Sequence, residues 1–470
     1  MVVGSRTQQL LKCGKNASFS NQIKFGRSFY TFGNRKYVNQ AKNFGSSKEN
    51  SFVRLCDCKR LHSSRETRST ITKLSPQEVD SILRANEYTH DFTTTGSVKS
   101  YDSNQLASNN PIEDTRCEST CLQTTGFLVG VFDGHGGGAC AQVIAKRLYN
   151  YITACLLPHD ILAQNIERGN TPALIESYND KVQFVDDIRD LYQKSFWKFL
   201  LDLSKTDSKQ FEMTEALERA FQRLDDDLSA EALPENLENP ETINIKTMSV
   251  AMSGAVACVA HIDGPHVHVA NVGDCGAVLG TLSDTNSWVA KKLTNDHNTY
   301  NQSEVDRILK EHPFNESTTV VPPNYHTPPY LSGKPEVTHH RLTPRDKFLI
   351  IGTDGLWDMM TPLQAVRFVG EHMKGKVTLS PLTLPKKQIT LSEINEMLLA
   401  RKEGLLTKPK DSNAATHVIR NALGGTEYGI DHSKISQMLT LPEEMVRLFR
   451  DDITVTIVYF DSEYLRHCPP

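Results

Sequence analysis

Residues 129–138 read Val-Gly-Val-Phe-Asp-Gly-His-Gly-Gly-Gly, an apolar run that ends in an acid, a histidine and a group of glycines. The apolar residues from Phe127 to Phe132, bounded by glycine, predict a short buried strand. The glycines after His135 permit a tight turn into a helix that starts near Ala139. Asp133 would then stand where the chain leaves the core. Taken alone, the motif fits equally well a joint in which Asp133 caps the helix and His135 is exposed.

Other acids occupy comparable places further along the chain. Asp354 follows one strand-like apolar run, and Asp451 and Asp452 precede another. Glu113 and Asp114 form a further pair upstream. Each of these is individually typical of a turn or a cap. Carboxylates recur at strand ends without compensating basic residues beside Asp133 or Asp354. Hard cations explain this pattern better, since such cations take oxygen ligands and keep several waters.

These motifs, in this order, resemble those of the metal-dependent protein phosphatase (PPM) family. The resemblance spans residues 100–460 and rests on Glu113-Asp114, Val131 to Gly136, Ser253 to Ala255, Asn271 to Asp274, Asp296-His297, Thr353 to Asp358 and Asp451-Asp452. It implies an α+β fold, a four-layer αββα sandwich of two antiparallel sheets flanked by helices. It also implies protein serine/threonine phosphatase activity.

The same resemblance implies magnesium or manganese as cofactor, with two ions per site and a third, weaker ion. Asp133 would bridge the two main ions, and the backbone carbonyl of Gly134 would bind one of them. The other implied ligands, direct or through water, are Asp354, Asp451, Glu113, Asp114, Asp358 and Asp274. His135 is the implied general acid, because a histidine can hold a proton near neutral pH and release it to an alkoxide.

Within the family, longer strings resemble the mitochondrial pyruvate dehydrogenase phosphatases. These strings are Asp102 to Leu106, Cys121 to Thr124, Pro322 to Tyr330 and Asn413 to His417. The closer resemblance implies phosphoserine on the E1 α subunit of pyruvate dehydrogenase as substrate and the mitochondrial matrix as location. It implies the lipoyl-bearing E2 component as docking partner, with a regulatory subunit as a further candidate.

The chain departs from the family pattern in three places. Asn109 stands where the family commonly has an arginine that grips the substrate phosphate, and Arg116 is a candidate replacement. Cys275-Gly276 follows Asp274 where Ser-Arg is usual. No Arg-x-Phe-Gly-Asp segment occurs between His312 and Pro322. The open alternatives are therefore a non-catalytic or weakly active variant, a phosphatase for another matrix phosphoprotein, and a metal-dependent phosphohydrolase or nuclease.

The amino-terminal segment differs in kind from the rest. Residues 1–48 contain many Lys, Arg and Ser residues and no acid until Glu49. This composition predicts a mitochondrial transit peptide, although a basic tail that binds acidic partners has the same character. The expected organisation is a leader over 1–70 and a phosphatase domain over 75–465, with helical insertions at 155–245 and 374–440.

Composition narrows the function further. A net charge of −4 gives no basic field for nucleic acid, and no apolar run approaches the roughly 18 residues that span a bilayer. The ten cysteines are scattered, as expected for reduced thiols. We interpret His261, His266 and His268 as exposed strand residues rather than zinc ligands.

Periodicity predicts several further elements. An apolar face at helical spacing from Ala216 to Leu228 predicts a helix, and a second stripe from Ala414 to Ala422 predicts another. Strands are expected over Ser249–Ala260 and Val267–Leu279, joined by a hairpin at Asp263-Gly264. A final strand is expected over Ile453–Phe460.

Overall fold

A computed structural model describes residues 73–169, 171–178, 188–205, 211–233, 244–311, 332–385 and 389–468. The predicted leader lies outside these ranges, as do the string Pro322 to Tyr330 and the site of the absent Arg-x-Phe-Gly-Asp segment. Helix α3 (Pro76–Arg84) starts at a capping box in which Ser75 and Glu78 satisfy each other's backbone N–H groups.

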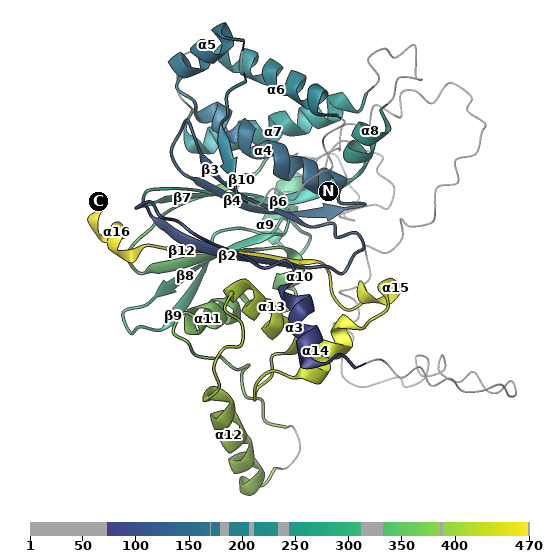
Figure 1. Cartoon of the computed structure of the whole chain (residues 1–470), viewed down its shortest axis with the longest axis vertical. Helices are drawn as coiled ribbons and strands as arrows, with labels where there is room; N and C mark the ends of the chain where they lie inside the picture. The colour runs from purple at the N-terminus through teal and green to yellow at the C-terminus, as the bar shows by residue number, and fades with distance from the viewer. Residues whose placement is uncertain are drawn as a thin grey trace, which may run out of the picture.

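Two antiparallel sheets of six strands each form the centre of the molecule (Figure 1). One sheet has the order β1-β2-β12-β11-β8-β9, with bounds Tyr88–Asp91, Val98–Leu106, Ile453–Phe460, Asp346–Gly352, Gly276–Leu282 and Trp288–Lys292. The other has the order β10-β7-β6-β4-β3-β5, with bounds Glu336–Arg341, His266–Val272, Gly254–Asp263, Phe127–His135, Thr115–Cys121 and Ile175–Ser177.

Helices cover the outer faces of both sheets, which gives the predicted αββα sandwich (Figure 1). The layer on the β4 sheet consists of α4 (Ala139–Leu156), α5 (His159–Glu167), α6 (Arg189–Ser204), α7 (Met213–Glu231) and α8 (Ile245–Met252). The layer on the β12 sheet includes α3, α11 (Pro362–His372), α13 (Ala414–Gly424) and α14 (His432–Leu439). The remaining helices are α9 (Gln302–Glu311), α10 (Asp354–Trp357), α12 (Leu391–Leu405), α15 (Glu443–Val446) and α16 (Ser462–His467). The α+β fold class is thus confirmed.

The elements with the strongest apolar patterns form where they are expected. Strand β12 has the predicted bounds, and the apolar faces of α7 and α13 are buried. Strand β4 continues three residues beyond Phe132, so Asp133 and His135 belong to the strand itself. Gly136 and Gly137 then turn into α4 with positive φ angles of 72° and 115°. Gly138, not Asp133, is the N-cap of α4, so the capping interpretation of Asp133 is wrong.

Two predicted strands differ from the structure. Residues up to Met252 of the expected Ser249–Ala260 strand belong to α8, and β6 starts at Gly254. The expected Val267–Leu279 strand is two strands in different sheets, β7 and β8, which are separated at Gly273. Gly273 has φ of 100°, and a Cβ there would collide with Val256, so only glycine allows this crossing. The hairpin at Asp263-Gly264 is confirmed.

Polar side chains occupy part of the space between the sheets. Arg116 and Glu118 on β3 form a buried ion pair with an N–O distance of 2.7 Å. Thr456 on β12 donates to Glu118 across the sheets. Arg116 is fully enclosed by this pairing, so the hypothesis that it grips a substrate phosphate is wrong.

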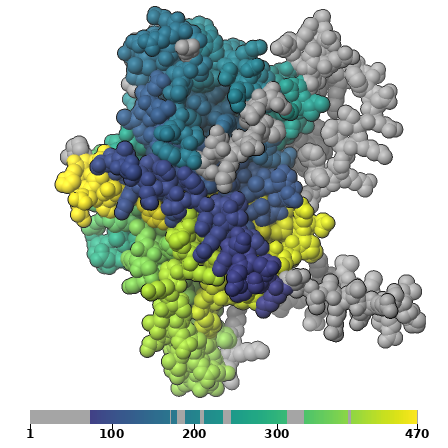
Figure 2. Space-filling view, in the orientation of Figure 1, coloured from purple at the N-terminus to yellow at the C-terminus, as the bar shows by residue number. Residues whose placement is uncertain are grey.

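The structure also tests the predictions about cysteines, histidines and membrane-spanning helices. Seven cysteines fall within the described ranges and all are free thiols. His261 is 1 % exposed and lies within 3.1 Å of the Thr125 carbonyl oxygen, so its expected exposure is wrong. Helix α12 projects from the body with several exposed leucines (Figures 1 and 2). Within the described ranges, no helix has the length and apolar composition that a bilayer crossing requires.

Candidate metal centre

The predicted acids meet at one edge of the sandwich, where strands from both sheets begin or end. Asp133 lies near the end of β4, and Asp114 lies directly before β3 in the same sheet. Asp354 starts α10 after β11, and Asp451 precedes β12 in the other sheet. The apolar strands bury most of their length, so the acids at their ends are brought together in a partly dry environment.

Asp114 is held between two threonines of the opposite sheet. Its carboxylate accepts hydrogen bonds from the hydroxyls of Thr353 at 2.9 Å and Thr454 at 2.7 Å. Burial, together with the charge of Asp452, raises the pKa of Asp114 well above its ordinary value. The two threonines therefore fix the position of a carboxylate that the surroundings disfavour as a bare anion.

Asp133 and Asp354 form the centre of the cluster, because the carboxylate of each influences the pKa of the other. Burial raises the pKa of Asp133 well above its ordinary value, and Asp114, Asp354, Asp451 and Asp274 raise it further. Burial and the neighbouring carboxylates also raise the pKa of Asp354. These raised pKa values reflect like charges that are crowded in a space where water does not fully screen them.

The other predicted residues border this centre. Asp358 is among the carboxylates that raise the pKa of Asp354. A Cβ on Gly134 would collide with the backbone carbonyl of Glu113, so the absence of a side chain lets these two segments touch. Burial raises the pKa of Glu113, and its Oε2 atom is buried without a hydrogen-bond partner.

The chemistry of this donor set fits magnesium or manganese. Every side chain in it is a carboxylate, which hard divalent cations prefer. A cation would relieve the mutual repulsion of these acids and could bind the Glu113 Oε2 atom, which accepts no hydrogen bond. Among the described residues, no three His, Cys, Asp or Glu side chains already stand in an arrangement that could hold a metal ion. The ligand roles of these residues therefore stay predictions.

His135 lies beside the cluster, with Nδ1 3.6 Å from the Asp133 carboxylate. Its side chain is 23 % exposed, so it faces the opening of the site. Burial lowers the pKa of the His135 imidazole. A lowered pKa disfavours the protonated ring, so a general acid here would have to gain its proton when a phosphate dianion arrives.

Sequence reasoning missed the role of Asp452. This buried carboxylate accepts hydrogen bonds from the backbone N–H groups of Ser108, Asn109 and Glu113 and from the Asn109 side-chain amide, at 2.5 to 2.8 Å. It thereby ties the loop that carries Glu113 to the start of β12. The pair Asp451-Asp452 signalled that an acid matters here, but spacing does not show which of two adjacent acids faces the cluster and which holds the loop.

We expect Asp452→Asn to lower the free energy of unfolding by about 2 to 4 kcal/mol. The NH2 group of the new asparagine side chain would face backbone N–H groups, and two donors cannot form a hydrogen bond with each other. Denaturant titration of the metal-free chain measures this. Asp284→Asn is the matched control, since the Asp284 side chain is 83 % exposed, and it should change stability by less than about 0.5 kcal/mol. Equal stability of the two variants would contradict the role of Asp452.

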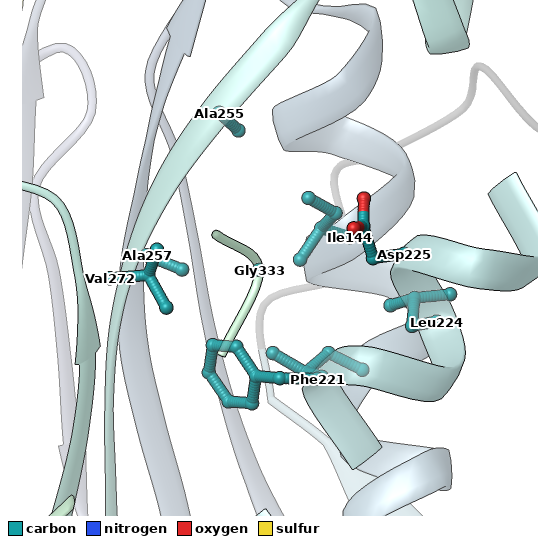
Figure 3. A pocket seen from close by; sticks show the side chains of 9 residues that line it. Ile144, Phe221, Leu224, Asp225, Ala255, Ala257, Val272 and Gly333 are labelled. Atoms are coloured by element: carbon teal, nitrogen blue, oxygen red, sulfur yellow. The ribbon is translucent and has the colours of Figure 1, made fainter. Parts of the chain in front are cut away.

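A separate cavity lies between α4, α7 and the β4 sheet (Figure 3). Its volume is about 20 Å³, which is room for a single water molecule. Asp225 lies beside Ile144 at this cavity, and the apolar side chains of Phe221 and Val272 also line it (Figure 3). None of the predicted site residues lines it, so it offers no alternative substrate site.

Comparison with known proteins identifies the family. The model of the protein phosphatase 2C family matches residues 183–392. The chain is 41% identical over 451 positions to [pyruvate dehydrogenase [acetyl-transferring]]-phosphatase 1, mitochondrial, of Rattus norvegicus, with 83% of each chain covered. It is 39% identical over 469 positions to the human phosphatase 2 of the same name, with 87% of each covered. The yeast phosphatase 1 from Saccharomyces cerevisiae is 24% identical, with 82% of this chain and 73% of the relative covered.

With two relatives near 40% identity over most of their length, the chain belongs to the metal-dependent protein phosphatase (PPM, or protein phosphatase 2C) family.

Proposed function

We propose that this chain removes phosphate from phosphoserine on pyruvate dehydrogenase in mitochondria. As a member of the protein phosphatase 2C family, it is a metal-dependent protein serine/threonine phosphatase. The proposed substrate and location rest on the names of its relatives, which are mitochondrial phosphatases of that dehydrogenase. A non-catalytic variant is not favoured, because every acid of the predicted site is retained.

The proposed site uses two magnesium or manganese ions. Asp133 would contact both, the Gly134 carbonyl would bind one, and Asp354 and Asp451 would bind the other. Glu113 and Asp114 would act through bound water, Asp358 would support a third ion, and Asp274 would lie at the margin. When bound, such ions lower the pKa of a water molecule and neutralise the phosphoryl oxygens.

The chain's own residues would supply position and the proton. Thr353 and Thr454 hold the Asp114 carboxylate in place, and Asp452 holds the loop that carries Glu113. His135, partly exposed beside Asp133, would give its proton to the serine oxygen as that oxygen leaves. These hydrogen bonds would hold the acidic side chains in fixed positions. Fixed positions matter because a small displacement of a catalytic group lowers the rate steeply.

The observation that carries the proposal is the convergence of carboxylates from both sheets around Asp133. The experiment measures phosphate release from phosphorylated pyruvate dehydrogenase by the chain without its leader, with magnesium or manganese. EDTA should abolish release, and a structured nucleic acid should remain uncleaved. Cleavage of the nucleic acid in place of phosphate release would favour a nuclease.

The partners follow from the same proposal. The phosphorylated E1 α subunit would be the substrate, and the lipoyl-bearing E2 component would hold the enzyme near it. A regulatory subunit is a further proposed partner. Release of phosphate from isolated E1, compared with E1 bound to E2, separates substrate recognition from docking, because docking raises the local substrate concentration only in the complex.

We also propose the domain organisation predicted from the sequence: a leader over 1–70 and a phosphatase domain over 75–465, with insertions at 155–245 and 374–440. A reporter that carries residues 1 to about 60 at its amino terminus should enter mitochondria, because the segment is basic and lacks acids until Glu49. Fluorescence microscopy with a mitochondrial marker measures this. A reporter that stays in the cytosol would remove the targeting claim.

A further inference from the structure

The short helix α15 and the turn after it border the acidic centre. Helix α15 ends at Val446, and the chain then passes through Arg447 and Arg450 to Asp451 at the start of β12. In Figure 1, α15 lies at the edge of the sandwich from which β12 enters its sheet. Residues of this turn therefore stand at the rim of the predicted site.

Arg447 extends from this turn toward the site. Its guanidinium is 3.6 Å from the Glu113 carboxylate, and its side chain is 44 % exposed. Arg447 thus lies beside Glu113, a residue of the predicted centre, while remaining open to solvent.

Three other side chains of the described residues, Arg116, Arg450 and Asn109, are engaged by other groups. Arg116 is enclosed between the sheets by Glu118. Arg450 is 7 % exposed and donates a hydrogen bond to the Ser108 hydroxyl. Asn109, which replaces the arginine usual in the family, donates both its backbone N–H and its side-chain amide to Asp452. None of these three groups is placed to meet a phosphate that enters from solvent.

We infer that Arg447 binds the phosphate of the phosphoserine substrate, and so supplies from the turn before β12 the contact that Asn109 does not make. This inference rests on the proposed phosphatase function. A guanidinium suits the task because it presents paired N–H donors that match two oxygens of a phosphate dianion. Its 3.6 Å separation from Glu113 is longer than a hydrogen bond, so the guanidinium can turn toward a ligand.

The test compares Arg447→Ala, Arg447→Lys and the unchanged chain on a phosphoserine peptide. Loss of charge-assisted hydrogen bonds should raise KM by about tenfold to a hundredfold in the alanine variant. Inhibition by inorganic phosphate should weaken by a similar factor. Arg447→Lys should fall between the two, because an ammonium keeps the charge but loses the paired donors. Arg345→Ala, which removes an arginine whose side chain is 58 % exposed and paired with Asp284, is the matched control and should match the unchanged chain.

Two outcomes would overturn the inference. One is an unchanged KM together with unchanged phosphate inhibition in Arg447→Ala. The other is a shift in the magnesium concentration needed for half-maximal activity without any change in phosphate inhibition, which would make Arg447 a positioning residue for Glu113. Failure of the proposed function is distinct, since the unchanged chain itself would then release no phosphate from the peptide.

Discussion

Asp354→Asn should reduce phosphatase turnover by at least about a hundredfold at limiting magnesium, because it removes a formal charge from a site built for cations without changing side-chain volume. Asp133→Asn should be at least as severe, since that carboxylate is proposed to contact both ions. Phosphate release from a phosphoserine peptide across a magnesium titration measures both effects. Raising the magnesium concentration should recover part of the Asp354→Asn deficit and less of the Asp133→Asn deficit.

The same substitutions should have the opposite effect on the metal-free fold. Asp133 and Asp354 are buried among other carboxylates, and their raised pKa values mean that the charged forms cost stability at neutral pH. The thermal midpoint measured in EDTA should therefore rise or stay level in each variant, while the stabilisation by added magnesium should shrink. Asp284→Asn, an exposed control, should show neither change. Near-normal turnover at limiting magnesium in either variant would refute the two-ion proposal.

The sequence predicted the central strands well because their apolar runs have few competing interpretations. Strand β12 and the apolar part of β4 are examples, since nearly all of their residues are buried. Strand β2 gave no such signal, because Asp102 and Asn104 stand in its buried middle. Each is satisfied by specific partners: Asp102 accepts from Thr89 and from the Ala414 backbone, and Asn104 donates to the Leu83 carbonyl and the Thr416 hydroxyl. Apolar periodicity cannot reveal a strand whose burial depends on such partners.

The candidate site, too, was predictable only in part. Family motifs predicted which acids to examine, and the fold accounts for their convergence, since Asp133 and Asp354 lie at strand ends of different sheets. The supporting contacts were beyond sequence reasoning. Asn109 looked like a lost phosphate contact, whereas in the structure it bonds to Asp452 and fixes the loop before Glu113. Tertiary partners of this kind are set by which residues the fold brings together, not by their spacing along the chain.

His135→Ala should slow the release of phosphate from phosphoserine by about 10² to 10⁴, the usual effect of losing a general acid. The fold should persist, because the side chain is partly exposed and its contact with Asp133 is a long one of 3.6 Å. His135→Gln serves as a second variant, since glutamine is polar but cannot release a proton at neutral pH. Both variants should need the same magnesium concentration as the unchanged chain.

The leaving group provides the decisive comparison for His135. A serine alkoxide needs a proton as it departs, whereas an aryl oxide leaves without one, so the deficit of both variants should shrink on an aryl phosphate. The lowered pKa of the His135 imidazole adds a second expectation, because a phosphate dianion would have to raise that pKa before the ring could act as an acid. Substrates whose phosphate is already protonated should therefore depend less on His135. An equal loss on aryl phosphate and phosphoserine would show that the ring serves another purpose, such as orienting Asp133.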